Sequence, residues 1–141
     1  MSASITQVRP TPWKGRQRKT VEFDSSFLVA VMEAPTPWEE DIAGLVGAFD
    51  PVLLTSVRSE LERLASKGDK KGKFAALALE LVAEGRFKVE PDAGGKPDDE
   101  IISFALRTAA AVATIDSELV ERLRASKVSS VITLRQGRVS F

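Results

Sequence analysis

Apolar positions along the chain alternate between short runs typical of buried strands and wider spacings typical of helices. The short runs predict strands at 21–23, 52–55, 87–89, 111–114 and 131–134, with an edge segment at 139–141. The wider spacings predict helices at 27–32, 38–49, 57–65, 74–83, 98–110 and 117–125. Strands that alternate with helices indicate an α/β fold, here a three-layer α/β/α sandwich around a mostly parallel sheet of about five strands.

The segments between these elements carry turn and breaker residues. Asp50-Pro51 is predicted to break the helix that begins at Trp38, and the lysines at 70, 71 and 73 are predicted to form a solvated loop. Two glycines and two prolines predict a loop at 91–97, after which acidic residues open the next helix. Trp13 and Trp38 are interpreted as packing residues rather than base-stacking platforms.

Composition narrows the chemistry that is available. The chain has 141 residues, of which 43% are hydrophobic, enough for one compact domain at 21–141. It contains no cysteine and no histidine, which excludes disulfides, thiolate zinc sites and Ser-His-Asp triads. No apolar run approaches the roughly 20 residues of a membrane span, so we expect a cytoplasmic protein without a membrane partner. Catalysis would then rest on carboxylates, hydroxyls, lysines or a bound cofactor, and carboxylates alone suit Mg²⁺ or Mn²⁺.

Charge is distributed unevenly although the formal net charge is zero. Residues 1–20 contain five of the twenty basic residues and no acid, which leaves fifteen bases against twenty acids in the remainder. A basic arm is typical of a tether for nucleic acid, because each neutralised phosphate releases counterions. The candidate RNA contacts are Lys14, Arg16, Arg18 and Lys19. A flexible, merely solubilising leader is the alternative reading of the same segment.

Acidic side chains recur where predicted strands end and helices begin. Asp24 follows the first strand, Glu60 lies on the flank of an apolar helix face, Asp99 opens the helix after the glycine-rich loop, and Asp116 follows the fourth strand. The carboxyl ends of parallel strands share one edge of the sheet, so these carboxylates are expected to meet in one pocket. Their repulsion would require a divalent cation. The alternative for each aspartate is a helix N-cap, which is the commoner role of a single such residue.

Four motifs in this order resemble the PIN domain family. They are Val21-Glu22-Phe23-Asp24-Ser25-Ser26-Phe27-Leu28, then Leu54-Thr55-Ser56-Val57-Arg58-Ser59-Glu60-Leu61, then Pro97-Asp98-Asp99-Glu100-Ile101-Ile102, and then Val112-Ala113-Thr114-Ile115-Asp116. The resemblance covers 21 to about 135. It is strongest to an archaeal subgroup similar to the eukaryotic pre-ribosomal RNA processing endonucleases, and weaker to VapC toxins. The closing segment 131–138 supports that subgroup.

The resemblance implies a catalytic and metal-binding set of Asp24, Glu60, Asp99 and Asp116, with Mg²⁺ or Mn²⁺ as cofactor. Asp98 is implied as an accessory acid, with Thr114, Ser25 and Ser26 in supporting roles. Asp99 is preferred to Asp98 because the apolar pair that follows it matches the family pattern. The chain departs from that pattern at Ser25-Ser26, where Thr-Asn is usual, and at Ile115, where Asn is frequent. Both departures would reduce metal affinity and turnover.

The function implied by the resemblance is metal-assisted hydrolysis of RNA by an endoribonuclease, with pre-ribosomal RNA as a candidate substrate and a homodimer as a candidate assembly. One alternative is a VapC-like toxin, which would need an antitoxin partner. The other is a ribosome-assembly factor that binds RNA but has lost cleavage. Growth inhibition relieved by a neighbouring gene product would favour the toxin, and metal-independent RNA binding without product would favour the assembly factor.

Overall fold

The computed structural model describes residues 18–141, in which strands and helices alternate. The strands are β1 (Lys19–Phe23), β2 (Phe49–Leu54), β3 (Lys88–Glu90), β4 (Ala111–Ala113), β5 (Val131–Arg135) and β6 (Arg138–Ser140). The helices are α1 (Ser25–Glu33), α2 (Trp38–Val46), α3 (Thr55–Ala65), α4 (Lys70–Ala83), α5 (Pro97–Thr108) and α6 (Ser117–Ala125). Trp13 and most of the predicted basic arm lie outside the described residues.

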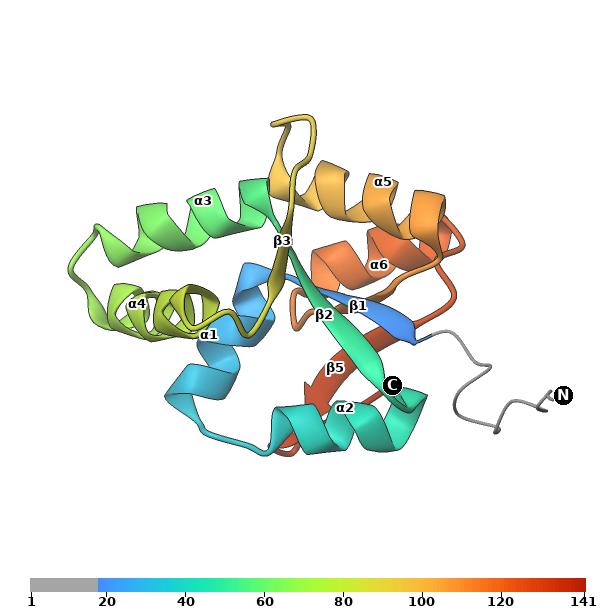
Figure 1. The fold of residues 1–141 in the computed structure, drawn as a ribbon, viewed down its shortest axis with the longest axis horizontal. Helices are drawn as coiled ribbons and strands as arrows, with labels where there is room; N and C mark the ends of the chain where they lie inside the picture. The colour runs from blue at the N-terminus through green and yellow to red at the C-terminus, as the bar shows by residue number, and fades with distance from the viewer. Residues whose placement is uncertain (1–17) are drawn as a thin grey trace, which may run out of the picture.

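The strands form one six-stranded sheet in the order β3-β2-β1-β4-β5-β6 (Figure 1). Neighbouring strands are parallel, except that β6 runs antiparallel to β5. The predicted α/β class and mostly parallel sheet are confirmed, and the sixth strand is the predicted edge segment. A two-residue turn at Gln136-Gly137, with φ of 53° and 77°, joins β5 to β6 as a tight hairpin with positive φ at both positions.

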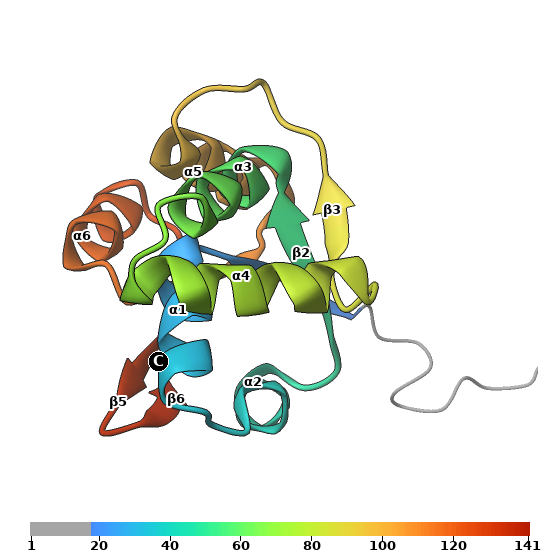
Figure 2. The same ribbon diagram turned by 90° about the vertical axis from the view of Figure 1, so that its left-hand side faces the viewer.

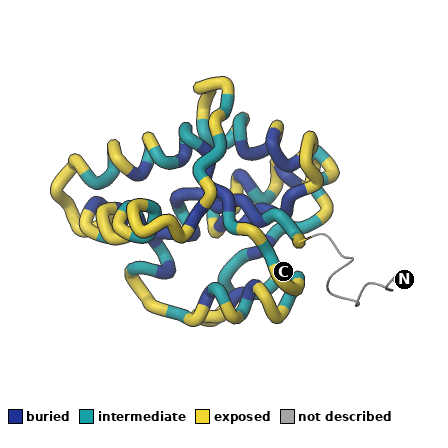
Figure 3. The backbone as a smooth tube through the Cα atoms, in the orientation of Figure 1, coloured by how far each residue is buried: buried dark blue, intermediate teal, exposed yellow. Residues whose placement is uncertain are grey.

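Helices cover both faces of the sheet (Figures 1 and 2). Side chains alternate along β1, so Val21 and Phe23 face one layer of helices while Thr20 and Glu22 face the other. Phe23 packs edge-on against Phe27 of α1 and Trp38 of α2, with ring centroids 5.6 Å and 5.3 Å apart. The central strands are buried while the outer surfaces of the helices are exposed (Figure 3).

Two predicted boundaries in the first half of the chain are wrong. The helix that begins at Trp38 ends at Val46, because Gly47 with φ of 84° ends it. Phe49, Asp50 and Pro51 belong to β2 and do not break a helix. Proline is tolerated there because β3 pairs with β2 only from Val52 onward, so no neighbouring strand needs a donor from Pro51 on that side.

The lysine cluster is also placed differently from the prediction. Lys70, Lys71 and Lys73 lie in the first turn of α4 rather than in a loop. Asp69 caps this helix, because its Oδ1 accepts a hydrogen bond of 2.7 Å from the Gly72 N–H. Gly72 also lets α4 approach α3 closely, since a Cβ at this position would lie 2.4 Å from the Leu64 carbonyl oxygen.

Within residues 18–141, every helix is too short or too polar to cross a bilayer.

Candidate active site

The candidate site lies at the carboxyl ends of β1 and β4, in the middle of the sheet. From β1 the chain proceeds to β2 and β3 on one side, and then crosses to β4 on the other side. Ligands of open α/β sheets bind at such a switch in strand order. Phe23 pairs with Ala113 in the parallel register, so the residues that follow them, Asp24 and Thr114, emerge side by side.

Asp24 is the most buried acid of the site, with 4% of its surface exposed. Its Oδ2 accepts hydrogen bonds from the Ser26 hydroxyl at 2.5 Å and from the Thr114 hydroxyl at 2.7 Å. Its Oδ1 accepts none from any residue in 18–141 and is not completely buried. The carboxylate is therefore held at one oxygen, while the other remains available to a ligand.

Backbone donors complete this network on the β4 side. The Ile115 N–H donates to Ser26 Oγ at 3.2 Å, and the Asp116 N–H donates to Thr114 Oγ1 at 3.1 Å. Each hydroxyl accepts from the backbone and directs its own proton to Asp24. Thr114 is fully buried, which fixes its orientation.

Asp116 has two connected roles in the structure. Its Oδ1 accepts hydrogen bonds from the Glu118 and Leu119 N–H groups and so caps α6. Its Oδ2 forms no hydrogen bond with the described residues. The capping alternative for Asp116 is thus correct for one oxygen, and the second oxygen is free for chemistry.

Glu60 reaches the site from the second turn of α3. The Ser25 hydroxyl donates a hydrogen bond of 2.7 Å to its Oε1, and Arg63 lies 3.7 Å from its Oε2. Its side chain is 28% exposed, whereas Glu62 is exposed on the solvent side, as the helical spacing predicts.

The charges of these acids act on one another. Burial raises the pKa of the Asp24 carboxyl above its usual value. The hydrogen bonds from Ser26 and Thr114 lower it, and the charges of Glu60 and Asp116 raise it further, so the net pKa is raised. Asp24, Glu60 and Asp116 thus share one electrostatic environment, in which a cation would relieve repulsion.

Asp98, and not Asp99, belongs to this acidic group. Burial raises the pKa of the half-buried Asp98 carboxyl to about 6, and the charges of Asp24, Asp116 and Glu60 contribute to the increase. Asp99 instead forms an ion pair with Arg122 at 2.7 Å, and its side chain is 55% exposed. This placement favours Asp98, which the sequence motif implied only as an accessory acid, and the metal-binding roles of Asp98 and Asp99 stay predictions. Consecutive helical residues point about 100° apart, so the two carboxylates extend from α5 in different directions.

The loop before α5 is held by acids that the sequence did not single out. Asp92 Oδ2 accepts from the Ser56 N–H at 3.0 Å, and its Oδ1 accepts from the Gly94 N–H at 2.9 Å. Burial opposes ionisation of Asp92, but these bonds lower the pKa of its carboxyl overall. Glu100 accepts from the Ala93 and Gly95 N–H groups. In the sequence, the spacing Asp92-Ala93-Gly94 is typical of a turn in which an aspartate side chain accepts a hydrogen bond from the backbone two residues later, so it could have predicted the contact with Gly94.

A cavity of about 370 Å³ lies between this loop and α3. Its lining includes Ser56, Ser59, Glu60 and Arg63, so it opens beside one of the site acids. Arg63 supplies a positive charge at this rim and is 58% exposed.

The donor set has the chemistry of a site for a hard divalent cation. All of its available atoms are carboxylate or hydroxyl oxygens, which are the ligands of Mg²⁺ and Mn²⁺. Among residues 18–141, no three acids converge closely enough to coordinate one ion together. This arrangement fits an ion such as Mg²⁺, which keeps several waters and takes only one or two carboxylates directly.

Arg18 and Lys19, the two described residues of the basic arm, lie at the amino end of β1, whereas the acids lie at the carboxyl ends of the strands. Arg18 Nε donates to Asp50 Oδ1 at 2.6 Å, and Lys19 Nζ donates to the Ala109 carbonyl at 3.1 Å. Lys14 and Arg16 lie outside the described residues. Their contact with RNA stays a prediction.

Comparisons with known proteins identify the family of this chain. The family model for a PIN like domain matches residues 21–137. The chain is 30% identical over 118 residues to ribonuclease VapC4 of Methanocaldococcus jannaschii, with 82% of this chain and 89% of that protein covered.

Two solved structures share the fold. The PIN domain endonuclease Utp24 superposes with a TM-score of 0.70 at 23% identity, covering 85% of this chain and 88% of that one. A domain of a functionally unknown protein from Methanocaldococcus jannaschii has a TM-score of 0.60 at 20% identity, covering 87% and 96%. The family match over most of the sequence, the sheet order and the acids at the strand ends lead to one assignment: this chain belongs to the PIN domain family.

Proposed function

We propose that the chain is a metal-dependent endoribonuclease in which Asp24, Glu60, Asp98 and Asp116 surround Mg²⁺ or Mn²⁺, with one or two of these carboxylates binding the ion directly and the others acting through bound water. The observation that carries this proposal is Asp24, which is held at Oδ2 by two hydroxyls and left open at Oδ1 amid three other acids. Ribonuclease VapC4 and the endonuclease Utp24 give the reaction class.

The chain's own side chains orient the site. Thr114 and Ser26 fix the Asp24 carboxylate, and Ser25 fixes the Glu60 carboxylate, so each presents its remaining oxygen in a set direction. When bound, a divalent ion would lower the pKa of an attacking water and stabilise the charge on the leaving oxygen. Ser25 and Ser26 are therefore positioning residues, and their hydroxyls replace the Thr-Asn pair usual in the family.

The decisive experiment is cleavage of labelled single-stranded and hairpin RNA with Mn²⁺, Mg²⁺ or EDTA. We expect metal-dependent products with 5′-phosphate and 3′-hydroxyl ends. Asp116→Asn should lower the rate by about 100-fold or more, because loss of a ligand should cost at least as much as loss of an outer-shell partner. Glu118→Gln, in the same helix turn, is the matched control and should cleave normally. Cleavage that persists in EDTA, or in Asp116→Asn at the wild-type rate, would refute the proposal.

Metal binding should also be visible without RNA. A ligand at 100 times its dissociation constant stabilises a protein by about 2.7 kcal/mol, which for a domain of this size raises the melting temperature by roughly 10 °C. We expect such a rise with Mn²⁺ for the wild type and little rise for Asp24→Asn. Without metal, Asp24→Asn should melt at or above the wild-type temperature, because it removes a buried charge from a repulsive group. A metal-free loss of stability would identify Asp24 as a structural residue instead.

This proposal has two versions, which differ in the physiological substrate. Processing of pre-ribosomal RNA follows from the resemblance of the sequence motifs. A toxin ribonuclease is favoured by the 30% identity to ribonuclease VapC4. Expression of the chain alone in a bacterial host separates them: growth arrest that Asp116→Asn abolishes supports the toxin, and normal growth with active enzyme supports processing.

A further inference from the structure

A second cavity is lined by Ile115 and Ser117, the two residues that flank Asp116 in the sequence. It has a volume of about 280 Å³ and lies between α6 and the β5–β6 hairpin. Its apolar wall includes Ile115, Val120, Leu134 and Phe141. Ile115 and Phe141 are 43% and 54% exposed, so part of this apolar wall is open to a ligand.

Ile115 links this cavity to the candidate cleavage site, because it lines the cavity and its backbone belongs to the hydrogen-bond network around Asp24. Ile115 lies between Thr114 and Asp116, and its backbone N–H donates to Ser26 Oγ, which in turn donates to Asp24. A strand of RNA whose scissile phosphate lies at the acids must leave them on this side or on the Glu60 side. The nucleotide adjacent to the cut would then reach Ile115 first.

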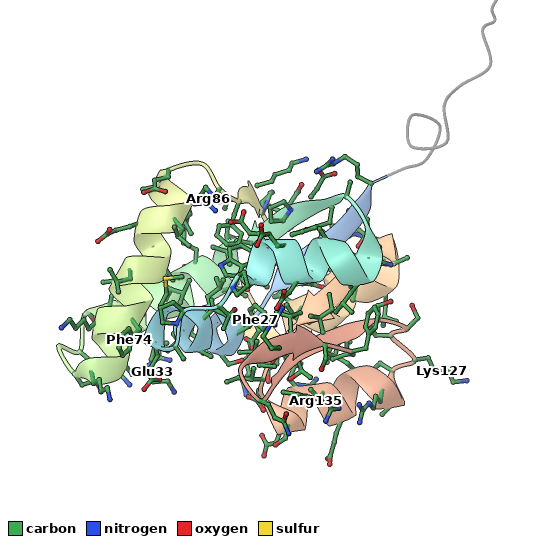
Figure 4. The ribbon with its side chains drawn as sticks, turned by 90° about the horizontal axis from the view of Figure 1, so that it is seen from below. Phe27, Glu33, Phe74, Arg86, Lys127 and Arg135 are labelled. Atoms are coloured by element: carbon green, nitrogen blue, oxygen red, sulfur yellow. The ribbon has the colours of Figure 1, made fainter. Side chains whose placement is uncertain are left out.

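The charged residues of the cavity suit a nucleotide. Arg124 and Arg135 line it, and neither forms an ion pair with an acid in residues 18–141. Arg135 lies at the hairpin beside α6 (Figure 4). Glu121 is the acid that lines the same wall. An apolar surface with an exposed aromatic ring and unpaired arginines is the combination that holds a base and its phosphate.

We propose that this cavity, here called the Ile115–Phe141 pocket, binds the base of the RNA nucleotide that flanks the cleaved bond. The base stacks on Phe141 and contacts Ile115 and Leu134, while Arg124 and Arg135 contact the backbone phosphates. This inference rests on the proposed function and adds the position of the substrate strand to it. Stacking tolerates every base, so the pocket orients the strand without specifying a sequence.

The first test uses small probes and needs no metal or cleavage. Adenosine 5′-monophosphate and ribose 5-phosphate share the sugar and phosphate and differ in the base. In EDTA, titration with adenosine 5′-monophosphate should shift the amide NMR signals of Ile115, Leu134 and Phe141, whereas ribose 5-phosphate should leave Ile115 and Leu134 unchanged. Equal shifts from both probes, or none from either, would overturn the proposal.

The second test measures binding of fluorescein-labelled oligoadenylate of eight nucleotides to the full chain in EDTA. Phe141→Ala should weaken binding by about 5- to 160-fold, the range for loss of one stacked base, with an unchanged slope against salt. Phe141→Trp should restore the affinity. Leu106→Ala is the matched control, since Leu106 is 56% exposed and lies on α5 outside the pocket. It should bind as the wild type does.

The outcomes separate this inference from the proposed function. If the wild type cleaves RNA and Phe141→Ala binds RNA as the wild type does, the pocket proposal is wrong and the proposed nuclease function stands. If RNA binding depends on Phe141 but the wild type does not cleave RNA, the result supports base binding in the pocket and contradicts the proposed nuclease function. A change in oligomeric state on Phe141→Ala, measured by light scattering, would mark the surface as a protein interface and overturn the proposal.

Discussion

Asp98→Asn should lower metal-dependent RNA cleavage by about 100-fold or more, while Asp99→Asn should stay within about threefold of the wild type. The reason is geometric. Asp98 shares the electrostatic environment of Asp24, Glu60 and Asp116, whereas the exposed Asp99 forms an ion pair with Arg122 at 2.7 Å. An exposed ion pair contributes little, so its loss should have little effect on the site.

Asp98→Asn and Asp99→Asn serve as matched controls for each other, because the two changes are chemically identical and one residue apart. Cleavage rates should be compared at saturating Mn²⁺ and again at limiting Mn²⁺, which separates loss of metal affinity from loss of turnover. An inactive Asp99→Asn beside an active Asp98→Asn would restore the assignment that the sequence motif favours. Arg122→Gln should behave as Asp99→Asn does if the ion pair is peripheral.

The second large effect concerns Glu22, on the opposite face of β1 from Phe23. Its side chain is completely buried, and neither carboxylate oxygen has a hydrogen-bond partner in the described part of the chain. Burial and the nearby Asp24 charge raise the pKa of the Glu22 carboxyl to about 9, although Arg107 opposes the increase. The group is therefore neutral in the folded protein at neutral pH and ionised in the unfolded chain.

This difference makes stability depend on pH. A folded-state pKa above the unfolded one gives stability that is complete below the unfolded pKa and decreases as pH rises toward the folded pKa. Between the ordinary glutamate pKa of 4.5 and about 9, the wild type should lose stability at about 1.4 kcal/mol per pH unit from this group. Glu22→Gln should remove that slope, and the difference between the two proteins should approach about 3 kcal/mol from pH 6 to pH 8.

Urea unfolding in EDTA at several pH values measures this effect, since the other acids contribute equally to both proteins. Glu62→Gln is the control, because Glu62 is exposed on α3 and should leave the pH dependence of the wild type unchanged. Parallel stability curves for the wild type and Glu22→Gln would contradict a neutral, buried Glu22.

The sequence predicted those site residues whose position depends on element order alone. Asp24 and Asp116 follow strands, and parallel strands must end at one edge, so their proximity required no side-chain detail. Glu60 could be identified from helical spacing, which distinguishes its face from that of Glu62. The choice between Asp98 and Asp99 required the rotation of α5 about its axis, which packing against the sheet decides.

Other features were hidden for related reasons. The burial of Glu22 depends on β1 being central, with helices on both faces, and a lone glutamate in a strand gives no sign of this. The Asp92 contacts join the loop before α5 to the first turn of α3, which is distant in sequence. Helix α4 begins at Lys70 although its first turn contains three lysines that repel one another. The Asp69 cap and the close approach to α3 at Gly72 stabilise this turn, and the spacing of apolar residues gives no sign of either.

The position of Arg18 and Lys19 at the amino end of β1 would set a minimum length for a substrate that contacted them and also reached the acids. Arg18 and Lys19 lie before or at the first residue of a five-residue strand, and Asp24 follows its last. At about 3.3 Å per residue, this strand separates them by roughly 16 Å. A stacked nucleic-acid strand advances about 3.4 Å per nucleotide, so about five nucleotides are needed to bridge that span. Fragments shorter than this would be handled by the acidic edge alone, which would make such products easier to release than their parent RNA.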